Sequence, residues 1–117
     1  MTLRECYETL GADLEGALKR LASEKLVERF ALKFLNDTSF GELEKALGDK
    51  NYEEAFRAAH TLKGVAANLS FTRLQEVSSE MTEMLREGNA PADGQYIETV
   101  RAEYARTVEA LKQLQGA

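Results

Sequence analysis

Apolar residues recur every three or four positions along almost the whole chain, and this spacing constrains the fold more than any other feature. It is the period of a helix that buries one side. No segment alternates apolar and polar residues with the period of two that a half-buried strand requires. The single proline, Pro91, leaves the rest of the chain free to form long helices. The sequence therefore predicts an all-α fold.

Glycine, serine and asparagine residues divide this pattern into helices. Gly11 separates two short helices, Ser23 is placed to cap a long helix, and Asn51, with Glu54 three positions on, is placed to cap the next one. The expected helices are 2–9, 11–20, about 23–48, 51–69, 71–88 and about 93–115, with a loop at 89–92.

The stretch 23–48 carries two apolar sets that are out of phase on a straight helix. Its expected core residues are Leu26, Val27, Phe30, Ala31, Phe34, Leu35, Phe40, Leu43, Ala46 and Leu47. Polar residues separate the two sets, and Ser39 with Glu42 could form a capping box there. We expect one long helix with a bend near 36–40, and two separate helices are the alternative.

Long helices joined by short loops run antiparallel to their neighbours. We therefore expect an antiparallel up-down-up-down four-helix bundle over 23–115. The two helices within 1–22 are too short to be stable alone, so we expect them to cap one end of the bundle. With 117 residues, the chain fits a single domain spanning 1–117.

Composition and charge exclude several classes of protein. The net charge of −5 argues against a surface for duplex nucleic acid, which would be basic. The N-terminus lacks the apolar segment of a signal peptide, and no apolar run approaches the ~20 residues of a membrane span. Cys6 is the only cysteine and cannot form an internal disulfide. We expect a cytoplasmic protein without membrane or nucleic-acid partners, and Met1 and the compact ends favour a free-standing one.

His60 is the only histidine, and it lies in the middle of the helix expected at 51–69. The core stripe of that helix centres on Ala55, Ala59, Leu62 and Ala66. On a helical wheel His60 falls roughly 120° from this centre, on the side facing water. Histidine is the side chain best suited to act as a neutral nitrogen nucleophile near pH 7. His60 is therefore the candidate reactive residue.

The residues around His60 suit transfer of a phosphoryl group. Lys63, one turn on at the border of the core, can direct its ammonium toward phosphoryl oxygens bound to His60. Gly64 has no side chain to block an approaching protein, although glycine inside a helix costs about 0.5–1 kcal/mol relative to alanine. Ala67 extends this cleared face by one turn, and Arg57 adds positive charge one turn before His60.

Simpler explanations exist for each of these residues. A lone histidine on a helix surface usually has no chemical role, and Gly64 could instead allow close helix packing. A metal site needs several ligands, which one histidine without a cysteine cluster does not supply. No nucleophile elbow accompanies His60, so a serine or cysteine hydrolase is not supported.

The segment Ala59-His60-Thr61-Leu62-Lys63-Gly64-Val65-Ala66-Ala67-Asn68-Leu69 resembles the signature of histidine phosphotransfer (HPt) domains. The polar turn at 48–49 before this helix, and Phe71-Thr72-Arg73-Leu74 after it, also resemble that family. The resemblance covers about 23–115. One position departs from it, because Ser70 stands where the family usually has glycine. If the backbone there is left-handed, serine costs roughly 1–2 kcal/mol more.

The resemblance implies a function in phosphorelays. His60 would be the phosphorylated residue, Lys63 would stabilise the phosphoryl group, and Gly64 would leave room for it. Partners would be response-regulator receiver domains and a hybrid sensor kinase, docking on the exposed sides of 51–69 and 71–88, where Arg57, Thr61, Ala67 and Asn68 lie. The resemblance implies a phosphocarrier without kinase activity, nucleotide site, cofactor or bound metal, with Mg²⁺ on the receiver. We expect it to be a monomer.

Two other functions remain open. A non-catalytic helical adaptor would bind signalling partners without accepting phosphate, and it would not need His60. The dimerisation and phosphoacceptor part of a sensor kinase would have an acidic residue directly after the histidine and a proline nearby. Thr61 and the absence of a nearby proline argue against the second alternative.

Overall fold

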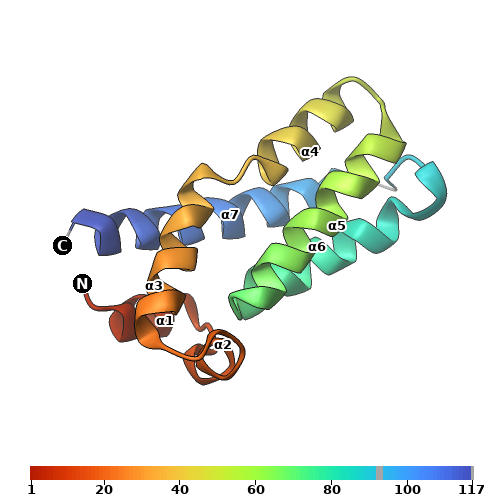
Figure 1. Ribbon diagram of the computed structural model, residues 1–117. Coiled ribbons are helices and arrows are strands. Elements are labelled where there is room, and N and C mark those ends of the chain that lie inside the picture. The colour runs from red at the N-terminus through yellow and green to blue at the C-terminus, as the bar shows by residue number, and fades with distance from the viewer. Residues whose placement is uncertain (92–93, 117) are drawn as a thin grey trace.

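The computed structural model describes residues 1–91 and 94–116, and every regular element in them is helical, as Figure 1 shows. This confirms the all-α class. Position 92 of the expected loop, and position 93, where the last helix was expected to begin, lie outside the described residues. The α-helices are α1 (Leu3–Leu10), α2 (Leu14–Leu21), α3 (Glu24–Lys33), α4 (Ser39–Gly48), α5 (Tyr52–Asn68), α6 (Thr72–Met84) and α7 (Gln95–Gly116), with 3₁₀ turns η1 (Phe34–Asn36) and η2 (Arg86–Gly88).

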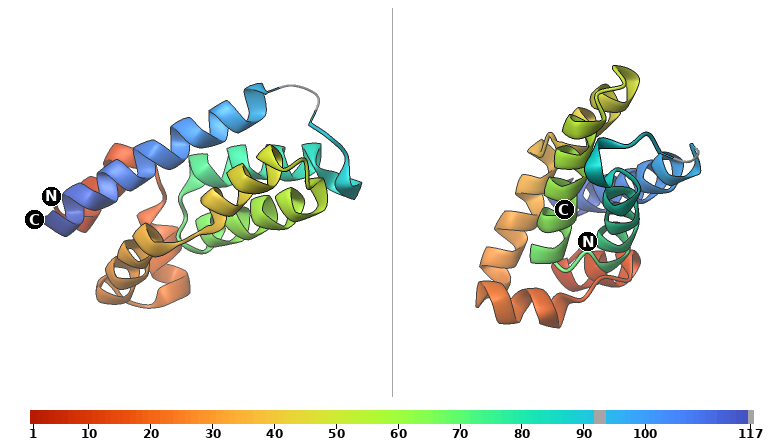
Figure 2. Two further views of the ribbon diagram at one scale, coloured as in Figure 1. Left: turned by 90° about the horizontal axis from the view of Figure 1, so that it is seen from above. Right: turned by 90° about the vertical axis from the view of Figure 1, so that its right-hand side faces the viewer.

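Helices α4, α5, α6 and α7 form the larger part of the molecule, each lying beside the next (Figures 1 and 2). Most of the side chains that they bury against one another are apolar, and Ser39, Ser78, Thr82 and Thr107 are the buried polar ones. Fully buried members from these helices include Leu43, Ala55, Ala59, Leu62, Ala66, Leu74, Met81, Val100 and Leu111. Removal of these side chains from water is the main favourable contribution to folding.

The N-terminal helices share this core. α1 lies beside α7, where the Arg106 guanidinium donates hydrogen bonds to the carbonyl oxygens of Thr9 and Leu10, both at 2.9 Å. The Tyr7 ring lies 5.6 Å from the Phe71 ring, which contacts the Phe34 ring at 5.8 Å. Aromatic pairs at such distances add to the energy of burial. The short helices α1 and α2 are thus held by tertiary packing.

The C-terminal end of α5 is held by the N-terminal helices. The Tyr7 hydroxyl donates to the Leu69 carbonyl at 2.7 Å, and Arg20 Nε donates to the Asn68 carbonyl at 3.2 Å. These donors satisfy carbonyls that the helix end leaves free. Ser70 has a left-handed backbone (φ +57), and Arg20 also donates to its hydroxyl. This hydrogen bond offsets part of the cost of a serine at a position that favours glycine.

Two expectations about residues 23–48 are wrong. The helix does not continue through a bend, because Asp37 is extended (ψ 134) and separates η1 from α4, so the alternative of two helices is the correct one. The Asp37 carboxylate accepts a hydrogen bond from the Ser39 backbone N–H at 2.8 Å. This local contact replaces the capping box, since Thr38 precedes α4 and Ser39 lies within it. The caps expected at Ser23 and Asn51 are confirmed.

Candidate functional site

Helix α5 presents His60 to solvent. Asn51 begins this helix, accepting a hydrogen bond from the Glu54 backbone N–H at 3.3 Å. Ala55, Ala59, Leu62 and Ala66 are all fully buried on its inner side, as the wheel indicated. The His60 side chain is exposed. The sequence-based placement of His60 outside the core is confirmed.

An aromatic ring lies beside His60 and carries a cation on its face. The Phe56 ring centroid is 6.1 Å from that of His60, with the planes tilted by 33°. The Arg86 guanidinium lies over the Phe56 ring at 5.7 Å from its centroid. Lys63 is half-buried, as expected of a residue at the edge of the core.

A groove of about 470 Å³ lies beside His60, between α3 and α5. Most of its surface is apolar. Its lining residues are Phe30, Lys33, Phe34, Asp37, His60, Thr61, Gly64, Val65, Asn68 and Leu69. We call this the His60 groove.

Phe30 was expected in the core, and the structure places it at the surface instead. It is the one large hydrophobic side chain in the described part of the chain that is exposed, at 36%. α3 ends at Lys33 and buries a narrow stripe, in which Val27 and Ala31 are fully covered. Phe30 falls beside this stripe, with the Lys33 ammonium 5.3 Å from its ring centroid.

Gly64 opens the surface one turn beyond His60. A Cβ atom added at Gly64 would meet no heavy atom within 4 Å outside its own surroundings on the helix. Close packing against another helix therefore does not explain the glycine. The space next to His60 is open to a molecule approaching from solvent.

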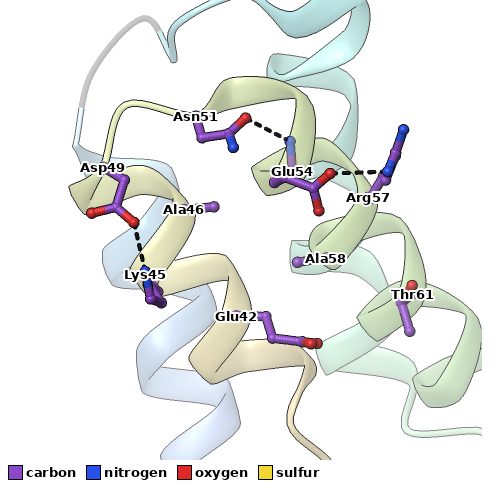
Figure 3. Close-up of a pocket in the computed structure, with 9 residues that line it drawn as sticks. All are labelled: Glu42, Lys45, Ala46, Asp49, Asn51, Glu54, Arg57, Ala58 and Thr61. Atoms are coloured by element: carbon purple, nitrogen blue, oxygen red, sulfur yellow. Dashed lines mark hydrogen bonds and ion pairs between the residues drawn. The ribbon is translucent and has the colours of Figure 1, made fainter.

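A second groove, of about 390 Å³, lies between α4 and α5 (Figure 3). Most of its lining residues are polar or charged, and several of the charges are paired with each other. Lys45 Nζ is 2.8 Å from the Asp49 carboxylate, and Arg57 is 2.9 Å from the Glu54 carboxylate. We call this the polar groove; it is lined by Glu42, Lys45, Ala46, Asp49, Asn51, Glu54, Arg57, Ala58 and Thr61.

The structure brings together only some of the residues that the sequence singled out. Gly64, Thr61 and Asn68 line the groove beside His60, and Thr61 also lines the polar groove. Arg57 lines the polar groove alone. Ala67 is half-buried and belongs to the lining of neither groove.

Four further residues near His60 were not singled out as site residues. Phe30 and Lys33 come from α3, Phe56 from α5 and Arg86 from η2. The spacing of Phe30 assigned it to the expected core, and no sequence motif marks Lys33 or Arg86. Phe56 is close to His60 because the two are one turn apart on α5, whereas the positions of Phe30, Lys33 and Arg86 follow from tertiary packing.

The site contains an exposed nucleophile, His60, with cationic side chains around it. Among the described residues, no three or more histidine, cysteine, aspartate or glutamate side chains are grouped so that they could hold a metal ion. None of the helices in that part of the chain is long and apolar enough to cross a membrane. An exposed imidazole with an ammonium one turn away and open space beside it can accept and release an electrophilic group brought by another molecule.

A family model described as "Hpt domain" matches residues 35–114. The match includes α4, α5, α6 and most of α7, and therefore His60, Lys63 and Gly64. Residues of α1, α2 and α3 lie outside it. No curated protein and no solved structure matches the chain.

Proposed function

The chain belongs to the Hpt domain family, whose members take part in phosphorelays as histidine phosphotransfer proteins, and from this premise we propose that His60 is its phosphoryl carrier. The observation that supports this most is that the one histidine of the chain lies within the family match, exposed in the middle of α5. The phosphoryl group would come from, and return to, aspartates of response-regulator receiver domains and of a hybrid sensor kinase.

The transfer needs one nucleophile from this chain. A ring nitrogen of neutral His60, Nε2 in our proposal, attacks the phosphorus of an aspartyl phosphate with its lone pair. The N–P bond forms while the P–O bond to the aspartate breaks, and the aspartate leaves as a carboxylate with the electron pair. The proton on the other ring nitrogen remains with the imidazole or passes to water. The reverse step returns the phosphoryl group to an aspartate.

Lys63 and Gly64 would assist this step in different ways. The Lys63 ammonium stabilises the phosphoryl oxygens as negative charge shifts during transfer. The open space at Gly64 lets the receiver bring phosphorus within reach of His60. The receiver and its Mg²⁺ supply the remaining electrostatic stabilisation. This chain thus acts as a carrier with no kinase activity and no nucleotide site of its own.

In place of the face on 51–69 and 71–88 that the sequence suggested, we propose that the receiver docks across the His60 groove, between α3 and α5. Thr61 and Asn68 lie on its α5 side, and Phe30 and Lys33 lie on its α3 side. Ala67 and Arg57 would lie at the edge of the contact. An apolar centre with a polar rim is typical of a transient interface.

The finer features of the fold are part of the same proposal. α3 with α4, then α5, α6 and α7, would be the four members of an up-down-up-down bundle, and α1 with α2 would cap one end. We propose that the chain forms a single domain over 1–117 and works as a monomer in the cytoplasm.

A transfer assay tests the function. The protein is incubated with a receiver that carries labelled aspartyl phosphate, and label that is labile to acid and stable to base is measured on it. We expect His60→Gln to accept no such label. Acceptance by His60→Gln at the wild-type level would refute the proposal.

The role of Lys63 needs a rate measurement. Lys63→Ala should slow transfer by roughly 10²–10³, as loss of one charge-stabilising donor does in enzymes. Circular dichroism verifies that the variant is folded. An unchanged rate would remove Lys63 from the mechanism.

A further inference from the structure

A third groove, of about 500 Å³, lies between α6 and α7, which pack side by side. Most of its surface is apolar, and Val77 of α6 and Ala102 of α7 are among the residues that line it. We call it the α6–α7 groove. Its lining shares no residue with the His60 groove or with the polar groove. A molecule bound here would therefore use a surface of its own.

Carboxylates gather along both helices of this groove. Glu76 on α6 and Glu98 and Glu103 on α7 line it, and Glu80 lines an adjoining hollow that shares residues with it. Arg73 is the one cation among the described residues of the two linings. These five side chains carry a net charge of −3, whereas the whole chain carries −5. Much of the protein's excess negative charge is thus concentrated on this face.

On the α7 edge, the carboxylates already share cations of the protein. Glu98 pairs with Arg101, but the same guanidinium also pairs with Glu44 of α4 at 2.9 Å. Glu103 pairs with Arg106 at 3.0 Å. One cation shared between two carboxylates leaves negative charge on this edge.

On the α6 edge, the carboxylates have no such cation. Glu76 and Glu80 are both exposed, and neither forms an ion pair within the part of the chain that the structure describes. They lie four residues apart on α6, and like charges at this spacing repel each other and destabilise a helix. A cation brought by another molecule would remove this repulsion.

An apolar groove with acidic edges is complementary to a helix that has apolar residues on one face and lysine or arginine beside them. The residues that line the groove on α7 extend from position 95 to 103, or about 12 Å along the helix axis, which fits two to three turns of a bound helix. The aliphatic stems of lysine and arginine can lie along the apolar surface while their charged ends reach the carboxylates.

We propose that the α6–α7 groove is a docking site for a basic amphipathic helix of a partner protein. The apolar face of the partner helix covers Val77 and Ala102. Its cations reach Glu76 and Glu80 on one edge and Glu98 on the other. Because the lining shares no residue with the His60 groove, the partner would anchor this protein through a surface separate from that of His60.

A synthetic peptide tests the fit. The peptide has 18 residues of leucine, alanine and lysine, with the leucines on one helical face and the lysines on both sides of it, and it is titrated into the ¹⁵N-labelled protein. We expect saturable amide shifts centred on 73–80 and 95–103. A scrambled peptide of the same composition has the same charge and no apolar face, and it should bind about tenfold more weakly. Shifts centred elsewhere, or equal affinity for the two peptides, would overturn the inference.

Charge variants test the acidic edge. Glu76→Gln combined with Glu80→Gln should weaken binding of the amphipathic peptide about tenfold, since each exposed ion pair contributes a few-fold. Glu24→Gln combined with Glu28→Gln is the matched control, because these are also exposed glutamates four residues apart on a helix, α3, and they line none of the three grooves. An equal loss in both double variants would show that only the overall charge of the protein attracts the peptide, and the site would be refuted.

A second pair of variants tests the apolar part of the groove. Ala102→Lys places bulk and positive charge in it and should abolish binding, whereas Ala105→Lys, at an exposed position of α7 outside the lining, should retain it. Circular dichroism verifies that both variants are folded. His60→Gln should bind the peptide as the wild type does, so this site can stand or fall independently of the phosphorelay function. Equal binding by the two lysine variants would contradict the inference. So would amide shifts at 73–80 and 95–103 that depend on protein concentration without peptide, because a second copy of the chain would then be the occupant.

Discussion

The two grooves beside α5 have similar volumes, about 470 and 390 Å³, and opposite chemistry. In the polar groove, charges from α4 and α5 already form ion pairs within the protein, such as Lys45 with Asp49. In the His60 groove, an exposed phenylalanine from α3 faces the open surface at Gly64. In the polar groove, charged side chains pair with one another, whereas the His60 groove leaves apolar surface exposed to solvent next to the one histidine.

This difference shows where a partner gains most by binding. Covering the polar groove would desolvate ion pairs that return little energy, because exposed pairs contribute only about 0–1 kcal/mol. Covering Phe30 and its neighbours removes apolar surface from water, which is favourable in proportion to the area. The same contact places a partner beside His60. The contrast between the grooves therefore supports docking across α3 and α5.

Among changes to residues that line the two grooves, apart from His60 itself, the largest expected effect comes from filling the space at Gly64. Gly64→Gln should lower the rate of phosphoryl transfer from a receiver by about 10²-fold, because small displacements of reacting groups can have effects of this size. Gly41→Gln is the control, since Gly41 is also an exposed helical glycine with no atoms near its Cβ position, on α4. Equal transfer rates for both variants would show that clearance near His60 does not matter.

Next in size is the contribution of Phe30 to docking. Phe30→Ala should weaken binding of a receiver roughly tenfold, or about 1.4 kcal/mol, as loss of a contributing aromatic side chain at an interface does. Isothermal titration calorimetry measures this affinity. Glu42→Ala in the polar groove serves as the control and should bind as the wild type does. A larger loss of receiver affinity for Glu42→Ala than for Phe30→Ala would indicate that the receiver docks on the polar groove.

A buried hydrogen bond from Tyr7 holds Leu69 at the end of the His60 groove. Because Tyr7 is titratable, the stability of the folded protein should decrease at alkaline pH. Burial raises the pKa of Tyr7, whose hydroxyl donates to the Leu69 carbonyl. Below a pH of about 10 Tyr7 is neutral in both the folded and the unfolded chain; above it the unfolded chain ionises first, so the free energy of unfolding falls.

Tyr7→Phe tests this contribution. The variant should lose about 1 kcal/mol of stability at neutral pH through the lost hydrogen bond. Above a pH of about 10 its stability should fall less steeply than that of the wild type, by up to about 1.4 kcal/mol per pH unit. Urea unfolding over a pH series measures both quantities. Parallel curves for the two proteins would contradict the role of Tyr7.

The smallest effect is expected at Arg57, on the far edge of α5. Arg57→Ala should change receiver affinity by less than about 1 kcal/mol, because its guanidinium is exposed and paired with Glu54. As a charge at the rim, it should alter the association rate and its salt dependence more than the dissociation rate. Stopped-flow binding at two salt concentrations separates these effects. A loss greater than that of Phe30→Ala would place the polar groove at the interface.

Periodicity predicted the helices and the exposure of His60, because both depend on spacing within one segment. The interruption near 36–40 was located from the sequence, but one bent helix was preferred over two helices. The contact between the Asp37 carboxylate and the Ser39 N–H lies at this break, and an apolar pattern carries no sign of such a contact. Phe30 was misplaced because α3 is short and its buried stripe is narrow, so a residue at apolar spacing can still fall outside it.

The surroundings of His60 depend on contacts between elements that are distant in sequence. Lys63 and Gly64 were found because they share a helix with His60. Lys33 comes from α3 and Arg86 from η2, and the tertiary arrangement of these elements around α5 sets their positions. The Arg57 side chain points toward Glu54, with which it forms an ion pair. Sequence spacing alone does not decide which acidic residue pairs with an exposed arginine.

The central claim is that a receiver docks across the His60 groove and not across the polar groove. A titration of the ¹⁵N-labelled protein with an unphosphorylated receiver, followed by amide chemical shifts, tests it most directly. We expect the largest shifts at 30–37 and 60–69, with little change at 42–51. Large shifts confined to 42–57, with none at Phe30 or His60, would contradict it.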